Sequence, residues 1–474
     1  MNRIEETRCG CKMLAMACHG LSVFAALLED DAVRGMLNLL TAIGGDEDED
    51  GLWDEGIIGS RETIFDIYHG FYRLIADKAW DDHVLDLMLM ANNRLAALAA
   101  AEKPGLAERV REDAARDLQV LQELARLDGE KILLFVMACF ENDEWEGDAL
   151  FENFLAPRHW PVWRVSAENA DVAAVPAEAP AQEWLRARGE ELKTLFRRSR
   201  DWSGLVDALL TYYREVGCGV FANFAVFRLL EDGALEGVER PDPITVERLY
   251  CQEREQSVVL RNTEIFLLGL AASNIILYGS RGTGKSSLVK ALPNAYVGRG
   301  LRLIQLKKTE IQHFTRLVRA LAALPHKFIL YIDDLSFDET EQDYKDMKML
   351  LEGGVEARPA NVLVYATSNR KNLIRETFSE RRGDEVHARD SMEEKLSLAD
   401  RFGITVTFLA PDQEDFLSIV SRLAERAGLD LPAAELRRKA LLWTQNHNAR
   451  SGRSAQQFID NLRGELALKG AGIL

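Results

Sequence analysis

An eight-residue glycine-rich segment has the residue types and spacing needed to bind phosphate. It reads GSRGTGKS, follows the pattern G-x-x-x-x-G-K-[ST], and lies between an apolar run and a helical pattern. Glycines let successive backbone N–H groups converge on a phosphate, and the N-terminus of the following helix adds partial positive charge. We expect Lys285 to contact the β- and γ-phosphates of ATP and Ser286 to ligate Mg²⁺. The predicted phosphate-binding residues are Gly279, Ser280, Arg281, Gly282, Thr283, Gly284, Lys285, Ser286 and Ser287.

A pair of carboxylates, Asp333 and Asp334, follows the apolar run Phe328–Ile332, and Asp333 lies 48 residues after Lys285. We expect Asp333 to hold the Mg²⁺ shell and Asp334 to act as a base that polarises an attacking water. An ordinary turn at the end of a strand would have the same residue types. The position after a phosphate-binding segment favours the metal-binding interpretation.

Three further polar residues could act on the same phosphates. Asn369 ends the Thr-Ser-Asn sequence that follows an apolar run, where its side chain could orient the attacking water. The same three residues are also typical of a turn. Arg401 precedes another apolar run, and Arg453 opens the last predicted helix, so both could neutralise charge on a transferring phosphoryl group. Taken alone, each arginine could equally be an ordinary surface residue.

Five short apolar runs in the second half of the chain have strand character, and helix-length segments separate them. Strands that alternate with helices form a parallel sheet with helices on both faces. Ligands of such sheets bind beyond the carboxyl ends of the strands, where the polar residues described above would meet. The runs are Ile275–Tyr278, Leu301–Leu306, Phe328–Ile332, Val362–Ala366 and Ile404–Phe408.

The first half of the chain has a helical pattern and no catalytic motif. Apolar residues recur three and four positions apart from residue 13 to about 155. Ala173–Pro180 (AAVPAEAP) has a linker composition, because its prolines block regular pairing. A second helical stretch is predicted from about Gln182 to Leu230, and Pro241 and Pro243 mark the boundary after it.

The formal net charge of −18 is unevenly distributed over the 474 residues. Residues 1–245 have 25 Lys and Arg against 46 Asp and Glu, whereas residues 246–474 have 33 against 30. An acidic surface repels nucleic acid, so the first half is better suited to a protein partner than to a nucleic acid. The nearly neutral second half leaves nucleic-acid binding open.

Six scattered cysteines form no disulfide framework and favour a reducing compartment. The spacing of Cys9 and Cys11 matches no common zinc pattern, so we expect free thiols there. The uncharged stretch Met13–Leu28 is shorter than the about 20 residues of a membrane span, and we expect a buried helix. No other segment resembles an anchor. The chain is therefore predicted to be cytoplasmic and to have no membrane partner.

In chain order, these motifs resemble the Walker A, Walker B, sensor 1, arginine finger and sensor 2 motifs of AAA+ ATPases. Residues from about 248 to 465 also resemble a bacterial family of AAA+ ATPases known as domain of unknown function 815. The stretches that carry this resemblance are Arg261–Glu264, Phe266–Leu267, Asn274–Leu292, Asp333–Phe337, Leu351–Gly354, Glu356–Pro359, Tyr365–Arg370, Glu394–Leu398 and Ser451–Arg453.

The resemblance implies an α/β P-loop NTPase (AAA+) core with a small helical lid, preceded by an all-helical N-terminal domain. Arg401 would then reach the nucleotide of a neighbouring subunit as an arginine finger, and Arg453 would act on the nucleotide of its own subunit. The lid would begin at Asp412, whose carboxylate can cap a helix. The expected parts are a helical N-terminal domain (1–172), a linker (173–181), a helical continuation (182–243), the AAA+ core (244–410) and the lid (411–474).

The resemblance also implies a function: an oligomeric ATP hydrolase that uses ATP and Mg²⁺ to remodel or regulate a protein partner held by the helical half. Asp334 stands where such ATPases more often have Glu, which leaves the hydrolysis rate open. An Asp-Asp pair is also found in AAA+ proteins similar to helicase loaders, so a nucleic-acid-linked loader is one alternative. A non-hydrolysing ATP-dependent switch is the other.

Overall fold

The computed structural model describes residues 3–44, 61–100, 104–139, 155–165, 179–335, 359–369, 401–447 and 450–470. The chain divides into two compact units, Met1–Pro176 with Arg186–Ala222, and Ala177–Leu185 with Asn223–Leu474. Most of the predicted linker 173–181 lies outside the described residues, as do the family stretches Leu351–Gly354 and Glu394–Leu398 and nearly all of Glu356–Pro359.

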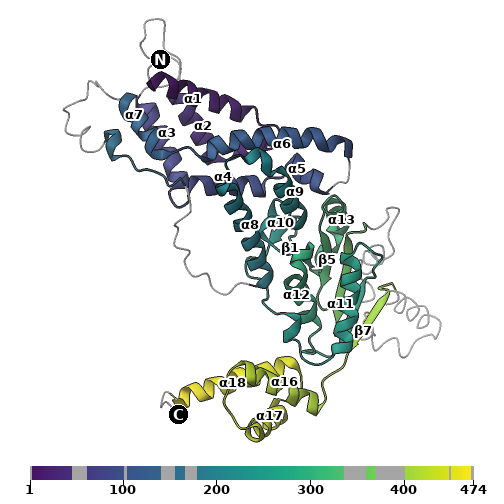
Figure 1. The fold of residues 1–474 in the computed structure, drawn as a ribbon. Coiled ribbons are helices and arrows are strands. Elements are labelled where there is room, and N and C mark those ends of the chain that lie inside the picture. Colours follow the sequence, from purple (N-terminus) through teal and green to yellow (C-terminus); the bar gives the residue numbers. More distant parts are fainter. Residues whose placement is uncertain are drawn as a thin grey trace. The chain divides into compact units, whose positions relative to one another are not determined.

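The described residues of the first unit form only helices and connecting loops (Figure 1). The all-helical N-terminal region that the resemblance implies is therefore confirmed. Its elements are α1 (Arg3–His19), η1 (Ala25–Glu29), α2 (Asp31–Ile43), α3 (Arg61–Ile75), α4 (Trp80–Met90), α5 (Arg94–Ala100), α6 (Pro104–Ala125), α7 (Gly129–Cys139), η3 (Pro157–His159), most of α8 (Pro180–Arg198), η4 (Trp202–Leu205), α9 (Val206–Glu215) and the start of α10 (Val220–Asn223).

The uncharged stretch Met13–Leu28 is not one buried helix, contrary to expectation. Helix α1 ends at His19, and the side chains of Met13 and Met16 are 61% and 66% exposed. The buried Asp117 of α6 explains the break, because its carboxylate accepts hydrogen bonds from three successive backbone N–H groups, those of residues 22–24. These bonds satisfy backbone donors outside a helix.

A seven-stranded sheet with the order β2-β1-β4-β5-β6-β3-β7 forms the centre of the second unit. Every pairing in it is parallel except that of β1 with β2. All five strands predicted from the apolar runs are confirmed, with small differences at their ends. They are β3 (Ile275–Gly279), β4 (Leu301–Leu306), β5 (Lys327–Ile332), β6 (Val362–Ser368) and β7 (Ile404–Phe408).

Two further strands correct the prediction that residues 182–243 continue the helical region. Strand β1 (Val226–Leu229) pairs with β4, and β2 (Leu235–Gly237) pairs with β1. Phe227 and Leu229 are buried while Arg228 between them is exposed, which is the period of a strand. Four residues are too few for this alternation to be distinguished from helical spacing in a sequence.

Helices cover the sheet on both faces (Figure 1). Helices α11 (Glu253–Leu267) and α12 (Lys285–Tyr296) pack in one apolar cluster with side chains of β3, β4, β5, β6 and β7. Helix α13 (Phe314–Ala322) contacts β6, whose intervening side chains point to the other face. The 3₁₀ helices η5 (Val246–Arg248), η6 (Val297–Arg299) and η7 (Lys308–His313) complete the connections described in this unit.

The lid consists of α16 (Gln413–Arg426), α17 (Ala433–His447) and α18 (Gly452–Gly470), which share a core that includes Phe416 and Leu462. The predicted cap is confirmed: Asp412 accepts a hydrogen bond of 2.8 Å from the backbone N–H of Asp415. Such a cap satisfies a donor that has no partner within the helix. Helix α16 therefore begins directly after the residue that was predicted to cap it.

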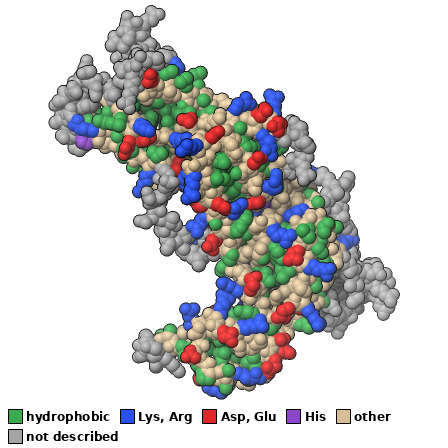
Figure 2. Space-filling model, viewed as in Figure 1, with side chains coloured by type: hydrophobic (Ala, Val, Ile, Leu, Met, Phe, Trp, Pro, Cys, Tyr) green, Lys and Arg blue, Asp and Glu red, His purple; other side chains and the backbone are tan. Residues whose placement is uncertain are grey.

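The described residues contain neither a membrane-spanning helix nor a cluster of metal-ligating side chains. None of their helices has the length and apolar character needed to cross a membrane. None of their His, Cys, Asp and Glu side chains gather in a group of three or more that could hold a metal ion. On the face that Figure 2 shows, basic and acidic side chains are interspersed, and neither sign forms a large patch of its own.

Candidate functional site

The phosphate-binding segment forms a tight loop between β3 and α12. Gly279 has a φ of 146°, and a Cβ added to it would lie only 2.0 Å from the carbonyl oxygen of Phe408 on β7. Gly282 has a φ of 77°, in the left-handed region that favours glycine. The glycines therefore allow both the close approach of β7 and the turn that leads into α12.

Lys285 holds this loop together from inside. Its amino group donates hydrogen bonds to the carbonyl oxygens of Gly279 (2.8 Å) and Ser280 (2.7 Å) and to Oδ1 of Asn369 (3.3 Å). Burial lowers the pKa of Lys285, although the carboxylates of Asp334 and Asp333 offset part of that decrease. The loop, the end of β6 and the ammonium group therefore form one polar cluster.

Ser286 and Asp333 place two oxygen atoms side by side at the start of α12. The hydroxyl of Ser286 donates to Oδ1 of Asp333 at 2.8 Å, and the hydroxyl of Thr367 donates to the same oxygen at 2.6 Å. Burial raises the pKa of Asp333, but the nearby hydroxyls of Thr367, Tyr331 and Ser286 stabilise the ionised carboxylate more strongly, so the pKa lies below its ordinary value. An ionised carboxylate beside a hydroxyl fits the preference of Mg²⁺ for hard oxygen ligands.

Asp334 is held in an unusual backbone conformation. Its φ is 53°, and its backbone N–H donates to the hydroxyl of Thr367 at 3.0 Å. The Nδ2 group of Asn369 donates to Oδ1 of Asp334 at 2.7 Å. Non-glycine residues rarely adopt this conformation, and where they do it is often at functional sites. Asn369 therefore connects Lys285 to Asp334 through one amide.

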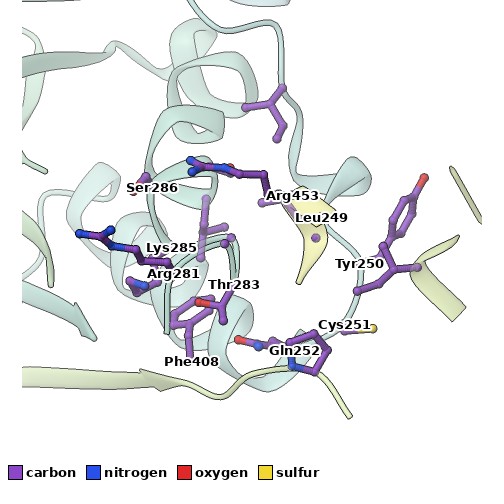
Figure 3. A pocket seen from close by; sticks show the side chains of 18 of the residues that line it. Leu249, Tyr250, Cys251, Gln252, Arg281, Thr283, Lys285, Ser286, Phe408 and Arg453 are labelled. Atoms are coloured by element: carbon purple, nitrogen blue, oxygen red, sulfur yellow. The ribbon is translucent and has the colours of Figure 1, made fainter. Parts of the chain in front are cut away.

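The last helix of the lid contacts the phosphate loop directly. The backbone N–H of Gly452 donates to the carbonyl oxygen of Gly282 at 3.1 Å. Ser451 is buried, and its hydroxyl accepts a hydrogen bond of 3.1 Å from the backbone N–H of Ser454, which caps the start of α18. Arg453 follows immediately, so the cap and the backbone contact place its side chain over the loop (Figure 3).

A cavity of about 520 Å³ brings most of the predicted residues together. Figure 3 shows Leu249, Tyr250, Cys251 and Gln252 on the opposite side of it from Arg281 and Ser286. Gly279, Ser280 and Arg401 lie outside its lining, although the first two bind Lys285 through their carbonyl groups. The predicted residues that line it are Arg281, Gly282, Thr283, Gly284, Lys285, Ser286, Ser287, Asp333, Asp334, Asn369 and Arg453.

The other end of this cavity was not predicted from the sequence. It is lined by Ile244, the segment Arg248–Gln252 and apolar residues of the lid such as Ile419. Cys251 and Gln252 have φ values of 66° and 70°, and the Gln252 amide donates to the carbonyl oxygen of Leu409 at 2.6 Å. This segment has no glycine or motif that would reveal its turn. It was also missed because its apolar partners come from the lid, which is distant in sequence.

Thr367 is a further residue of the site whose role was not predicted from the sequence. It is 2% exposed, and its hydroxyl joins Asp333 to the backbone of Asp334. The signal was present, because Thr367 precedes Asn369 by two residues at the end of a strand next to β5. Only the pairing of β5 with β6 shows that its hydroxyl faces both carboxylates.

A family model matches residues 222–466, more than half of the chain, and its description is protein of unknown function (DUF815). No curated protein sequence matches this chain. Among solved structures, RuvB of Thermotoga maritima, titled a Holliday junction branch migration motor, is 15% identical with a TM-score of 0.33. A variant of the same protein is 15% identical with a TM-score of 0.35. Each of these matches covers 48% of this chain and 67% of the other.

Proposed function

The chain belongs to the DUF815 family, and we propose that it is an AAA+ ATPase that binds ATP with Mg²⁺ and hydrolyses it. The sheet order and the P-loop make the second unit a nucleotide-binding AAA+ fold. The single observation that supports hydrolysis best is the amide of Asn369, which bonds to Lys285 and to Asp334. A group that binds phosphate and a group that can accept a proton are thereby held in one cluster.

Phosphate binding would use the loop, the start of α12 and two basic side chains. The first backbone N–H groups of α12 have no partner within the helix and carry partial positive charge. Lys285 would exchange its hydrogen bonds to Gly279 and Ser280 for phosphate oxygens. Arg453 would add a second positive charge from the lid, because it lines the same cavity.

Ser286 and Asp333 would hold Mg²⁺, since their oxygens already lie 2.8 Å apart and the pKa of Asp333 is lowered. When bound, the cation neutralises charge that develops on the phosphate oxygens. Asp334 would accept a proton from the attacking water, and Asn369 would keep the Asp334 carboxylate turned toward that water. Thr367 would fix the backbone from which both carboxylates project.

The nucleobase and ribose would occupy the part of the cavity between Leu249–Gln252 and the lid. This part is mainly apolar, with Leu249, Tyr250, Pro411 and Ile419 in its lining. Apolar and aromatic side chains with a few polar groups are typical of small-molecule sites. Because α18 touches the phosphate loop through Gly452, nucleotide binding and the position of the lid would be coupled.

These elements and the helical first unit support a proposal for the wider role. We propose that the subunits assemble, that Arg401 acts on the nucleotide of a neighbouring subunit, and that the ATPase cycle remodels or regulates a protein partner bound by the helical unit. The acidic balance of residues 1–245 supports a basic protein surface as that partner. A nucleic-acid-linked loader and a non-hydrolysing switch remain the alternatives to be tested.

The decisive experiment measures ATP binding and ATP turnover of the full chain beside Lys285→Ala and Asp334→Asn. We expect the wild type to bind and hydrolyse ATP, Lys285→Ala to lose binding, and Asp334→Asn to bind ATP but turn it over about 100-fold more slowly. Circular dichroism would show that both variants are folded. Binding without turnover in the wild type would instead favour the switch. Retention on DNA that weakens steeply with salt would favour the loader.

A further inference from the structure

Tyr331 is a fully buried tyrosine whose hydroxyl faces the proposed metal site. It lies on β5 two residues before Asp333, so the two side chains leave the strand in the same direction. Its side chain is 0% exposed. Its hydroxyl oxygen is buried and has no hydrogen-bond partner of good geometry among the described residues, although Ser286, Asp333 and Thr367 are its polar neighbours.

The neighbouring strand offers a matched comparison. Tyr365 on β6 is in register with Tyr331 and is equally buried. Its hydroxyl is paired with Thr263 at 2.9 Å and accepts a hydrogen bond of 3.1 Å from Nδ2 of Asn262, both on α11. Two tyrosines therefore lie side by side in the sheet, and only one of them has a hydroxyl that the helices of this unit satisfy.

A buried hydroxyl without a partner is unfavourable, and native structures contain few of them. A phenylalanine would fill the same space on β5 without that cost. Ser286, Asp333 and Thr367 contribute only oxygen atoms, a set suited to a hard, hydrated cation and not to a softer metal. The Tyr331 hydroxyl therefore lies where it can stabilise the Asp333 carboxylate when that carboxylate holds such a cation.

We propose that Tyr331 is a positioning residue of the Mg²⁺ site, whose hydroxyl restrains the Asp333 carboxylate when the cation is bound. The inference rests on the proposed function, because it needs a cation at Ser286 and Asp333. Tyr331 lies outside the lining of the nucleotide cavity. Removing its hydroxyl therefore changes how strongly the cation improves nucleotide binding, and leaves binding without a cation unchanged.

The test measures this coupling with the full chain and a fluorescent, non-hydrolysable ATP analogue. The dissociation constant of the analogue is determined in EDTA and in Mg²⁺, and the ratio of the two values is the coupling. For Tyr331→Phe we expect a ratio about 10-fold smaller than that of the wild type, as is usual when an outer-shell partner of a metal site is removed. The value in EDTA should not change.

Tyr365→Phe is the control, because it removes a buried hydroxyl from the same layer of the sheet. We expect it to lower the thermal unfolding midpoint and to leave the coupling unchanged. Tyr331→Phe should leave the midpoint unchanged, since its hydroxyl has no partner to lose when the cation is absent.

Three results would overturn the proposal. A wild-type ratio retained by Tyr331→Phe would reject the role of Tyr331 while the proposed function stands. An equal fall of the coupling ratio in Tyr331→Phe and Tyr365→Phe would show a general effect of the sheet and would also reject the role of Tyr331. A wild type whose affinity for the analogue does not depend on Mg²⁺ would reject the metal site itself.

Discussion

The amide of Asn369 is the point at which the phosphate-binding lysine and the proposed base meet. Its oxygen accepts from Lys285 at 3.3 Å, and its nitrogen donates to Asp334 at 2.7 Å. An amide can do both at once because it has a donor and an acceptor on one planar group. An aspartate in this position could not donate to Asp334 when ionised, and a leucine could do neither.

Replacing Asn369 should therefore impair turnover more than binding. For Asn369→Ala we expect kcat to fall by about 100-fold, because Asp334 loses the donor that orients it, with the dissociation constant of ATP within about 3-fold of wild type. Steady-state rates and equilibrium titration measure the two quantities. The control is Asn361→Ala. Asn361 directly precedes β6, at the opposite end of that strand from Asn369, and its amide donates hydrogen bonds to the carbonyl oxygens of Leu321 and Leu324. Equal losses of kcat in both variants would contradict the assignment.

Thr367 offers a second prediction, concerning stability. Its hydroxyl accepts from the backbone N–H of Asp334 and donates to Asp333, and valine has nearly the same shape without the hydroxyl. Thr367→Val should therefore lower the free energy of unfolding by about 1–3 kcal/mol, because a partly buried N–H loses its acceptor. Thr367→Ser should recover most of this loss. Urea denaturation followed by circular dichroism measures both, and a valine variant as stable as wild type would show that the hydrogen bond is dispensable.

Residue types and spacing identify the parts of this site that lie in or next to recognisable motifs. The loop, Asp333, Asp334 and Asn369 were found in this way, since each follows an apolar run. Thr367 and Tyr331 could not be assigned, because their importance depends on which strands are neighbours. That order becomes evident only from the pairing of β5 with β6.

Among the elements, the contact between the lid and the phosphate loop has the clearest consequence. Gly282 accepts from the backbone of Gly452, and a Cβ on Gly282 would lie 2.8 Å from Oγ of Ser451. A real Cβ does not come so close to another atom, so the lid or the loop would have to move. The loop therefore has room for the lid only because this residue is glycine.

Gly282→Ala should weaken ATP binding by separating these two elements. The left-handed conformation alone costs about 1–2 kcal/mol for alanine, and the contact with Ser451 adds to it, so we expect an affinity at least about tenfold lower. Gly428→Ala is the matched control, because Gly428 has a φ of 65° with no atom near its missing Cβ. That variant should lose stability and keep its affinity for ATP. Titration of both variants would decide, and equal affinities would show that the lid contact is not needed.

The elements that sequence patterns predicted are the ones long enough to show a period. The five core strands and the capped start of α16 were found because apolar runs and a single Asp412 cap mark them. Strands β1 and β2 were missed because they have four and three residues and gain their stability from pairing at the edge of the sheet. Local propensity contributes little in such short strands compared with that pairing.

At the scale of the whole molecule, the charge is distributed unequally along the chain but is mixed on the face that Figure 2 shows. Residues 1–245 carry the acidic excess, yet Figure 2 shows both signs interspersed on the visible face. Association with a polyanion needs a gathered positive surface. The visible face has no such surface and the net charge is −18, so we expect DNA not to be retained at physiological salt, which a filter-binding assay at several salt concentrations would measure. Retention with a steep salt dependence would contradict this expectation and support the loader.

Assembly is the property of the whole molecule on which the role of Arg401 depends. Arg401 lies before β7, outside the lining of the cavity in its own subunit, so its proposed target is the nucleotide of a neighbour. The ATPase rate per subunit should then rise with protein concentration until assembly is complete. Arg401→Ala should bind ATP normally but reduce this plateau by about 1000-fold, the effect typical of an arginine finger.

The matched control is Arg437→Ala, which removes an exposed arginine that pairs with the exposed Glu414 in the lid. An exposed ion pair contributes little, so its rate should equal that of the wild type. Sedimentation in the presence of the ATP analogue would establish whether Arg401→Ala still assembles. If the variant assembles and its maximal ATPase rate is still low, then the substitution impairs the chemical step and not assembly. If the maximal ATPase rate of Arg401→Ala equals that of the wild type, Arg401 is not an arginine finger. A rate independent of concentration in the wild type would mean that each subunit completes its own site, and the lid arginine, Arg453, would then be the cation to test next.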